Sequence, residues 1–233
     1  MSADAEPGPK EHSEGRFERL AMRAWRRVFR PFDYFAELER AIGDSSSVLD
    51  IGCGYPSPIR GFSKKFYAVG VDAFAPSIEK SRAEGIHNDY LMVDVLDVGS
   101  KVDAKSFDCV LAADLIEHMT KEEGLKLLAM MERIAKKRVV VFTPNGFLPQ
   151  GEYGGNPFQV HKSGWTPDEM RKMGYRIVGI NGHKSLRGMY ALVKYKPTFI
   201  WEIVSDSTQL VFKWFPRAAF QILCVKEGLK DAH

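Results

Sequence analysis

The chain has 233 residues, 45% of them apolar, and a formal net charge of +3. This length supports one substantial core and leaves little room for two full domains, and the charge is too small to indicate a nucleic-acid binder. The three cysteines are scattered and lack the spacing of a zinc site or a disulfide framework. The sequence also has no apolar run near the ~20 residues that cross a bilayer and no secretory signal. These features together predict a cytoplasmic protein.

The N-terminal part is predicted to be a polar lead followed by two helices. Residues 1–15 contain Pro, Gly and charges with little that could pack, which predicts a disordered segment. Residues 16–30 repeat apolar side chains every three or four positions and carry six arginines on other faces, so they predict a basic amphipathic helix. The next helical run, "FDYFAELERAIG", ends at Gly43. We therefore expect residues 16–44 to form a helical cap.

Short apolar runs alternate with helical stretches over residues 45–233. "PSIEKSRAEG" is one helix, and a second is expected from Lys121 to about Lys137 behind a capping box of Thr120 and Glu123. A similar capping box in "TPDE" begins a third helix. Strands that alternate with helices predict an α/β fold, a Rossmann-like, mostly parallel sheet with helices on both faces. The seven predicted strands are residues 47–51, 66–72, 89–94, 107–113, 138–143, 175–180 and 218–227.

The first of these strands leads into a glycine turn, "DIGCG". Asp50, Gly52 and Gly54 lie between a strand and a helix start, as in nucleotide-binding turns, although the third glycine of a dinucleotide fingerprint is absent. The turn has no lysine or arginine before Arg60, whereas phosphate-binding loops usually supply one. The turn therefore favours a ligand without a phosphate.

Two more acids follow the next two strands. Asp72 comes 18 positions after Gly54, where an acid can accept hydrogen bonds from ribose hydroxyls, and Asp94 ends the third strand. In open parallel sheets, ligands bind at the carboxyl ends of the strands. An acidic edge without phosphate-binding groups suits a cationic nucleoside.

The segments "VLDIGCG", "GVDAF", "MVDVLD" and "FDCVLAADLIEH", in this order, resemble the class I S-adenosylmethionine-dependent methyltransferases across roughly residues 45–180. The resemblance implies S-adenosylmethionine as methyl donor. It places the methionine part of the cofactor at the glycine turn, the ribose at the acid of the second strand and the adenine amine at the acid of the third. The cofactor-binding residues that it implies are Asp50, Gly52, Cys53, Gly54, Asp72, Ala73, Asp94, Val95 and Asp114.

Methyl transfer needs a positioned nucleophile, and a hydroxyl or ammonium acceptor also needs a base. Asp114, Glu117 and His118 are spaced so that one helical turn places them on a common face. His161 precedes the third capped helix, and both segments start from the carboxyl ends of neighbouring strands. The predicted catalytic residues are His161 as base, His118 as second candidate, and Asp114 beside them. His87 has no such neighbours in sequence.

A metal site is the alternative use of this group. "DLIEHM", "TPN" and "HKSGWT" are similar to the metal-dependent 3′-terminal RNA 2′-O-methyltransferases, in which Glu-x-x-Glu-His is followed by histidines. Asp114 replaces the first glutamate, and His161 is the one clear downstream match. A divalent metal would be held by Asp114, Glu117, His118 and His161, but we favour a role of these residues in shaping the pocket, with no metal.

Two amphipathic helices have several interpretations each. An inserted helix at about 198–215 carries an apolar stripe that is expected to pack on the domain, and its aromatic residues also suit an apolar substrate pocket or a homodimer contact. The Arg-rich helix at 16–30 is favoured as a lid over the cofactor. The alternatives are a surface for anionic membrane lipids and a phosphate track for RNA, the latter not favoured.

The resemblance and these features predict a methyltransferase that acts on oxygen or nitrogen of a small, lipophilic or glycosidic acceptor. Metal-assisted RNA 2′-O-methylation is one alternative. A protein that binds the cofactor without transferring a methyl group is the other.

Overall fold

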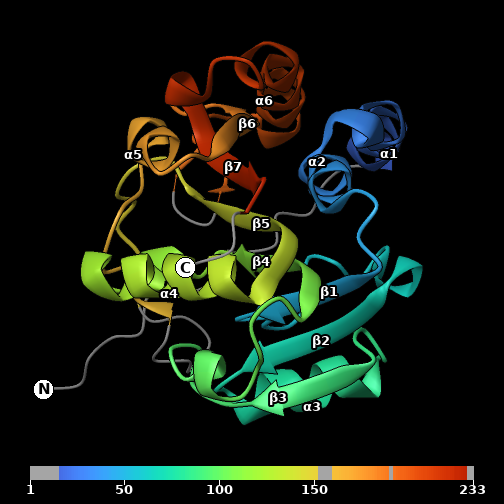
Figure 1. The fold of residues 1–233 in the computed structure, drawn as a ribbon. Helices are drawn as coiled ribbons and strands as arrows, with labels where there is room; N and C mark the ends of the chain where they lie inside the picture. The colour runs from blue at the N-terminus through green and yellow to red at the C-terminus, as the bar shows by residue number, and fades with distance from the viewer. Residues whose placement is uncertain (1–15, 152–158, 189–190, 230–233) are drawn as a thin grey trace, which may run out of the picture.

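The computed structural model describes residues 16–151, 159–188 and 191–229, so the predicted disordered lead at 1–15 lies outside the described residues. Seven strands form one sheet in the order β3-β2-β1-β4-β5-β7-β6, and β7 runs antiparallel to both of its neighbours (Figure 1). This arrangement confirms the predicted Rossmann-like fold. The strands are β1 Ser47–Ile51, β2 Tyr67–Asp72, β3 Asp89–Met92, β4 Phe107–Ala113, β5 Ala135–Pro144, β6 Arg176–His183 and β7 Ala219–Glu227.

Hydrophobic cores on the two faces of the sheet hold the helices in place. On one face the strands pack against α4, whose Leu127, Met131 and Ile134 are buried, and on the other they pack against α2 through Leu38 and Ile42. The described helices are α1 Arg16–Phe29, α2 Tyr34–Ile42, α3 Ala75–Ala83, α4 Lys121–Ile134, α5 Pro167–Lys172 and α6 Thr198–Phe212.

Local capping explains where several helices begin. Asp33 accepts a hydrogen bond from the Ala36 amide at the start of α2, and the predicted capping boxes are present at the starts of α4 and α5. The expected end of α4 near Lys137 is wrong, because β5 begins at Ala135. Ala135 pairs with Phe107 of β4, and Lys137 forms an ion pair with Asp108 at 3.0 Å. Residues 135–137, which the helical pattern had assigned to the last turn of the helix, therefore belong to β5.

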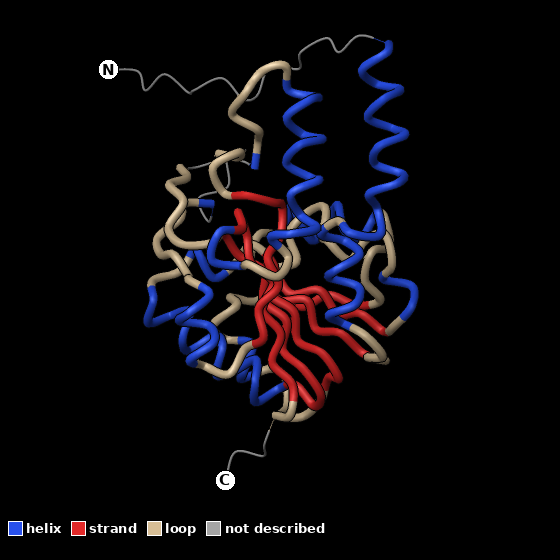
Figure 2. The backbone as a smooth tube through the Cα atoms, turned by 90° about the horizontal axis from the view of Figure 1, so that it is seen from above, coloured by secondary structure: helices blue, strands red, loops and turns tan. Residues whose placement is uncertain are grey.

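Helices α1 and α6 lie side by side and project from the sheet (Figure 2). The indole of Trp25 on α1 donates a hydrogen bond to Asp206 on α6 at 3.3 Å. The expectation that the apolar stripe of α6 packs on the domain is wrong, because the buried residues of this helix are Ser205 and Gln209 while several of its apolar side chains are exposed. Within the described part of the chain, no helix combines the length and the hydropathy of a membrane span.

Candidate active site

The glycine turn after β1 leaves an open space at its tip. Gly52 and Gly54 have φ angles of 68° and 55°, a region that side chains other than glycine seldom adopt. A Cβ atom added to Gly54 would meet only the Gly52 carbonyl, at 3.9 Å, so the backbone at this point faces unfilled space. The turn can therefore bring its backbone close to a ligand.

The two strand-end acids lie beside this turn. Asp72 accepts hydrogen bonds from the amides of Gly54 at 2.9 Å and Phe74 at 2.8 Å, and Asp94 accepts one from the Leu96 amide at 2.9 Å. These bonds fix both carboxylates at the wall of a cavity of about 550 Å³, which Ala73 also lines. The same cavity is lined by Val95, Asp114, Leu115 and Met119. The structure thus brings most of the predicted cofactor-binding residues to one cavity.

Asp50 lies behind the turn and lines neither large cavity of the described structure. Its Oδ2 accepts hydrogen bonds from the Ser57 hydroxyl at 2.6 Å and from Nε2 of His87 at 2.9 Å. Nδ1 of His87 is 3.2 Å from the Ser81 hydroxyl, and all these side chains are buried. Sequence analysis passed over His87, which holds Asp50 in place. Asp50 therefore supports the turn from behind.

Cys53 is the central residue of the turn and is buried. Burial, followed by the charges of Asp50 and Asp72, raises the pKa of its thiol far above the usual range. The thiol stays protonated, so Cys53 acts as a small residue in a crowded turn rather than as a nucleophile.

The predicted group after β4 forms one turn of 3-10 helix, Ile116–His118, rather than an α-helical turn. Asp114 precedes it with a φ angle of 47°, and its carboxylate accepts a hydrogen bond from Gln221 at 3.4 Å. Glu117 is buried and accepts a hydrogen bond from the Thr143 hydroxyl at 2.9 Å. Burial raises the pKa of both carboxyls, and the charge of Asp114 raises that of Glu117 further.

The rings of His118 and His161 make an edge-to-face contact with their centroids 4.8 Å apart. Nδ1 of His118 donates to the Val160 carbonyl at 3.3 Å, and Nδ1 of His161 donates to the Leu148 carbonyl at 2.6 Å. In the neutral rings, these bonds leave Nε2 as the unprotonated nitrogen. Burial and the charge of His161 lower the pKa of His118 to about 4, and burial lowers the pKa of His161. Both rings are therefore neutral at physiological pH.

The backbone around His161 fixes the position of this ring. The His161 amide donates to the Gln150 carbonyl at 3.1 Å, and the side-chain amide of Gln150 donates to the Gln159 carbonyl at 3.1 Å. The next two amides, of Lys162 and Ser163, donate to the Glu117 carbonyl at 2.7 Å and 3.0 Å. His161 is thus attached both to the loop after β5 and to the segment after β4.

Three of the four residues of the metal alternative come together. Glu117, His118 and His161 each offer one ligand atom, and these atoms lie within 4.8 Å of one another. Asp114 is not in this group. Metal-binding histidines usually donate a hydrogen bond from the other ring nitrogen to a carbonyl or carboxylate, as both Nδ1 atoms do here. Two imidazoles and one carboxylate are also ligands that suit a divalent transition metal.

A larger cavity of about 1590 Å³ adjoins the smaller one. The two cavities share Gly52, Gly54, Asp114, His118 and Gln159, whereas His161 and Glu117 line the larger cavity alone. Many of its other walls are apolar side chains from distant segments, which are Phe29, Phe32, Phe35, Leu148, Leu192 and Phe220.

Two polar residues of the larger cavity escaped the sequence analysis. Tyr34 stacks on Phe142 with centroids 4.1 Å apart, and its hydroxyl is buried without a hydrogen-bond partner in the described structure. Nothing in the local sequence singles out Tyr34. Gln221 could have been found, since it is the one polar residue in the run "AFQILCV" of a buried strand.

One family model matches part of the chain. The model of the methyltransferase domain matches residues 49–143, which run from β1 to β5 and include the glycine turn, both strand-end acids and the 3-10 turn. No curated protein matches the chain in sequence.

Solved structures share the fold. A SAM-dependent methyltransferase from Archaeoglobus fulgidus has a TM-score of 0.52 at 16% identity and covers 90% of this chain and 94% of its own. The methyltransferase domain of bacterial CtHen1-CN has a TM-score of 0.53 at 15% identity, with coverages of 85% and 99%. Phosphoethanolamine N-methyltransferase 2 of Haemonchus contortus, solved with S-adenosyl-L-methionine, has a TM-score of 0.53 at 17% identity, with coverages of 84% and 52%.

Proposed function

We propose that this chain, which carries the methyltransferase domain and fold of the class I S-adenosylmethionine-dependent enzymes, methylates an oxygen or nitrogen atom of a small, lipophilic or glycosidic acceptor. The observation that supports this reaction best is the pair of neutral histidines where the cavities meet. His118 lines both cavities, and His161 lines the larger one.

The smaller cavity fits S-adenosylmethionine, which supplies a methyl group on an activated sulfonium. The open backbone at Gly54 gives room for the methionine part, and the held carboxylates of Asp72 and Asp94 can accept hydrogen bonds from ribose hydroxyls and the adenine amine. These residues bind and orient the donor, which supplies much of the rate in such a transfer.

His161 is the proposed general base. Its pKa is lowered by burial, so the ring is unprotonated and can accept a proton from an acceptor hydroxyl or ammonium. The bond from Nδ1 to the Leu148 carbonyl orients Nε2, the atom that would take the proton. His118, which lines both cavities, has the same tautomer and is the second candidate for the general base.

The walls of the larger cavity indicate the acceptor class. Phe29, Phe32 and Phe35 come from the cap, and Leu148 and Phe220 come from the C-terminal half. Apolar side chains around a few polar groups are typical of pockets for lipophilic small molecules. We therefore place the acceptor between the cap and the histidines.

Methyl-labelled S-adenosylmethionine tests the proposal directly. Cell extract is separated into lipid, small-molecule, protein and RNA fractions, and each is incubated with the enzyme. We expect label in the lipid or small-molecule fraction, and a rate about a hundredfold or more lower for His161→Ala at unchanged cofactor affinity. His183→Ala is the matched control. Tight cofactor binding without labelling of any fraction would instead favour the non-catalytic alternative.

Metal-assisted RNA 2′-O-methylation is a second candidate, favoured by the clustered ligand atoms of Glu117, His118 and His161. A divalent ion held there would lower the pKa of an acceptor hydroxyl. Under this alternative, the three side chains bind the ion and the lowered histidine pKa values keep Nε2 free for it. RNA labelling that disappears after chelation and returns with Mn²⁺ would support it. Activity on RNA that survives exhaustive chelation excludes it.

A further inference from the structure

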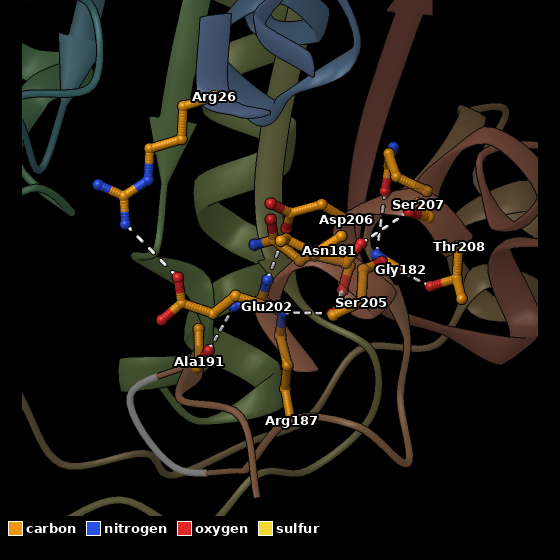
Figure 3. Close-up of polar contacts among 12 residues, drawn as sticks. Arg26, Asn181, Gly182, Arg187, Ala191, Glu202, Ser205, Asp206, Ser207 and Thr208 are labelled. Atoms are coloured by element: carbon orange, nitrogen blue, oxygen red, sulfur yellow. Dashed lines mark hydrogen bonds and ion pairs between the residues drawn. The ribbon is translucent and has the colours of Figure 1, made fainter. Parts of the chain in front are cut away.

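Helix α6 turns its polar side inward. Gln209 donates a hydrogen bond to the Gly179 carbonyl at 2.8 Å and accepts one from the Gly182 amide at 3.0 Å. Arg187 donates to the hydroxyl of Ser205 and to the carboxylate of Asp206, both at 2.9 Å. Figure 3 shows Arg187 reaching these two side chains. The Thr208 hydroxyl accepts a hydrogen bond from the His183 amide at 3.0 Å. These bonds fix the rotation of α6 about its axis.

The consequence is an apolar outer surface. Six apolar side chains in and directly after α6 are between 37% and 74% exposed, namely Ile200, Val204, Leu210, Val211, Trp214 and Phe215. A surface helix of a globular protein normally shows the opposite pattern, with its apolar stripe toward the core. Apolar side chains that gather on one exposed helix face usually mark a contact with a partner or a lipid surface.

Arginines lie on the neighbouring helix α1. Arg23, Arg27 and Arg30 are exposed, and their spacing places them on one side of the helix. Arg26 forms an ion pair with Glu202 of α6 at 3.5 Å. The other acid of α6, Asp206, is bonded to Trp25 and to Arg187. The carboxylates of α6 are thus already paired, and the exposed arginines of α1 remain as positive charge beside the apolar face.

We propose that the α1–α6 helix pair docks on an anionic lipid surface. Apolar and aromatic side chains on one face together with arginines are the composition of helices that bind at a membrane interface. The arginines would contact lipid phosphates, and the outer face of α6 would enter the headgroup region. An RNA partner would leave that apolar face uncovered. A second copy of the chain would bring two rows of arginines together with no free acid on α6 to pair with them.

The docking also suggests how the acceptor reaches the site, and this part of the inference rests on the proposed function. Arg26, Phe29, Arg30 and Phe32 line the larger cavity, and they belong to the same segment that would face the lipid. A lipophilic acceptor can therefore pass from the lipid surface to the histidines. Vesicle binding is measured without methyl transfer, so failure of the docking and failure of the reaction are distinguishable.

Sedimentation with vesicles tests the docking. The full chain is mixed with vesicles of phosphatidylcholine alone or with about 30% phosphatidylglycerol. The charge variant is Arg23→Gln with Arg27→Gln, matched by Lys136→Gln with Lys172→Gln elsewhere on the surface. The apolar variant is Val204→Gln with Val211→Gln. Its matched control has Met92→Gln with Leu125→Gln, two positions that are also exposed.

We expect the wild type to bind the anionic vesicles, and about 0.5 M salt to weaken this binding. The affinity should fall about twenty-fivefold for the arginine pair and about tenfold for the valine pair, while both controls bind as the wild type does. Trp214→Ser gives a second test of the apolar contact, because this exposed residue lies beyond the end of α6. Unfolding curves and cofactor affinity check that each variant is folded.

Three results would overturn the docking. The first is no binding of the wild type to anionic vesicles at low salt. The second is vesicle binding that neither the arginine pair nor the valine pair weakens. The third is a dimer that the valine pair dissociates, or an RNA complex that the arginine pair abolishes, in a protein that does not bind vesicles.

Discussion

The two cavities of the candidate active site are built in different ways. The smaller one is lined largely by neighbouring strand ends, and its acids are held by backbone amides close by, as Asp72 is held by Gly54 and Phe74. The larger one is assembled from segments far apart in the chain, from the cap to β7. Its polar groups are held by partners farther along the chain, as Asp114 is by the Gln221 side chain and His161 is by the Leu148 carbonyl.

The difference indicates which part of the molecule is fixed by local backbone geometry and which by tertiary contacts. A cofactor that is the same in every reaction suits a site built from a few adjacent turns. The larger cavity, which we propose holds the acceptor, is lined by several separate segments, so one of them can change while the others remain. Substitutions in the two regions should therefore have different consequences, and the following predictions test this.

The largest effect is expected at His87, behind the smaller cavity. His87→Phe leaves the buried carboxylate of Asp50 without its 2.9 Å partner, so the free energy of unfolding should fall by about 3 kcal/mol at pH 7. Urea denaturation measures this change. Ser81→Ala removes the bond on the other side of the ring and should cost about 1 kcal/mol. Equal losses in the two variants would contradict a special role of the bond between His87 and Asp50.

Asp72→Ala should weaken cofactor binding tenfold to a hundredfold, an effect of about 2 kcal/mol. The carboxylate both faces the smaller cavity and holds the Gly54 amide, so the ligand contact and the turn are lost together. Isothermal calorimetry with S-adenosylmethionine measures the affinity. Asp97→Ala is the matched control, since Asp97 is exposed and lines neither cavity. Wild-type affinity in Asp72→Ala would remove Asp72 from the cofactor site.

Helix α6, which borders the larger cavity, offers a comparison between neighbouring positions. Gln209→Ala leaves the Gly179 carbonyl and the Gly182 amide without a partner and should lower the free energy of unfolding by about 1.5 kcal/mol. Val211→Gln, two residues later on the exposed face, should change it by less than about 0.5 kcal/mol. Thermal or urea unfolding distinguishes the two. The reverse order would mean that the apolar face of α6 is the packed one.

Glu117→Gln is expected to stabilise the metal-free protein by about 1 kcal/mol at pH 8. The folded protein raises the pKa of Glu117 above its usual 4.5, because the charged form is buried near Asp114. The unfolded chain ionises more readily, so this residue lowers stability as the pH rises above 4.5. Below that pH, Glu117 is protonated in both states and the gain from the variant should vanish.

Urea unfolding at pH 4 and pH 8 measures this dependence. Added Mn²⁺ should stabilise the wild type and not Glu117→Gln if the cluster with His118 and His161 binds a metal ion. A gain from the variant that is the same at both pH values would show that buried charge is not its cause.

Much of the smaller cavity could be predicted from the sequence, because the sequence signals for its residues are local. A strand, a glycine turn and the acid that ends the next strand are each visible within a few residues. His87 was missed because it lies 37 residues from Asp50 and only the fold brings them together. Tyr34 was missed for the same reason, since its role depends on the distant Phe142.

Helix α6 shows a different limit of the sequence. The spacing of its apolar residues predicts a stripe, and the stripe exists. Periodicity cannot say which side of a helix meets the sheet, because that choice depends on partners such as Arg187 and the backbone of Gly179. The polar side has specific partners in β6 and the following loop, and these bonds outweigh the packing that the apolar side would have gained.

The hydrogen bonds around His161 have a consequence for how such an enzyme can diversify. The Gln150 carbonyl accepts a hydrogen bond from the His161 amide, and the amides of Lys162 and Ser163 donate to the Glu117 carbonyl. The position of the His161 ring, the base that we propose, is therefore set by bonds to Leu148 and Gln150 on one side and by the attachment of the next two residues to Glu117 on the other. Under the proposed function, changes elsewhere in the walls of the larger cavity can alter the acceptor while the bonds that hold the proposed base stay intact.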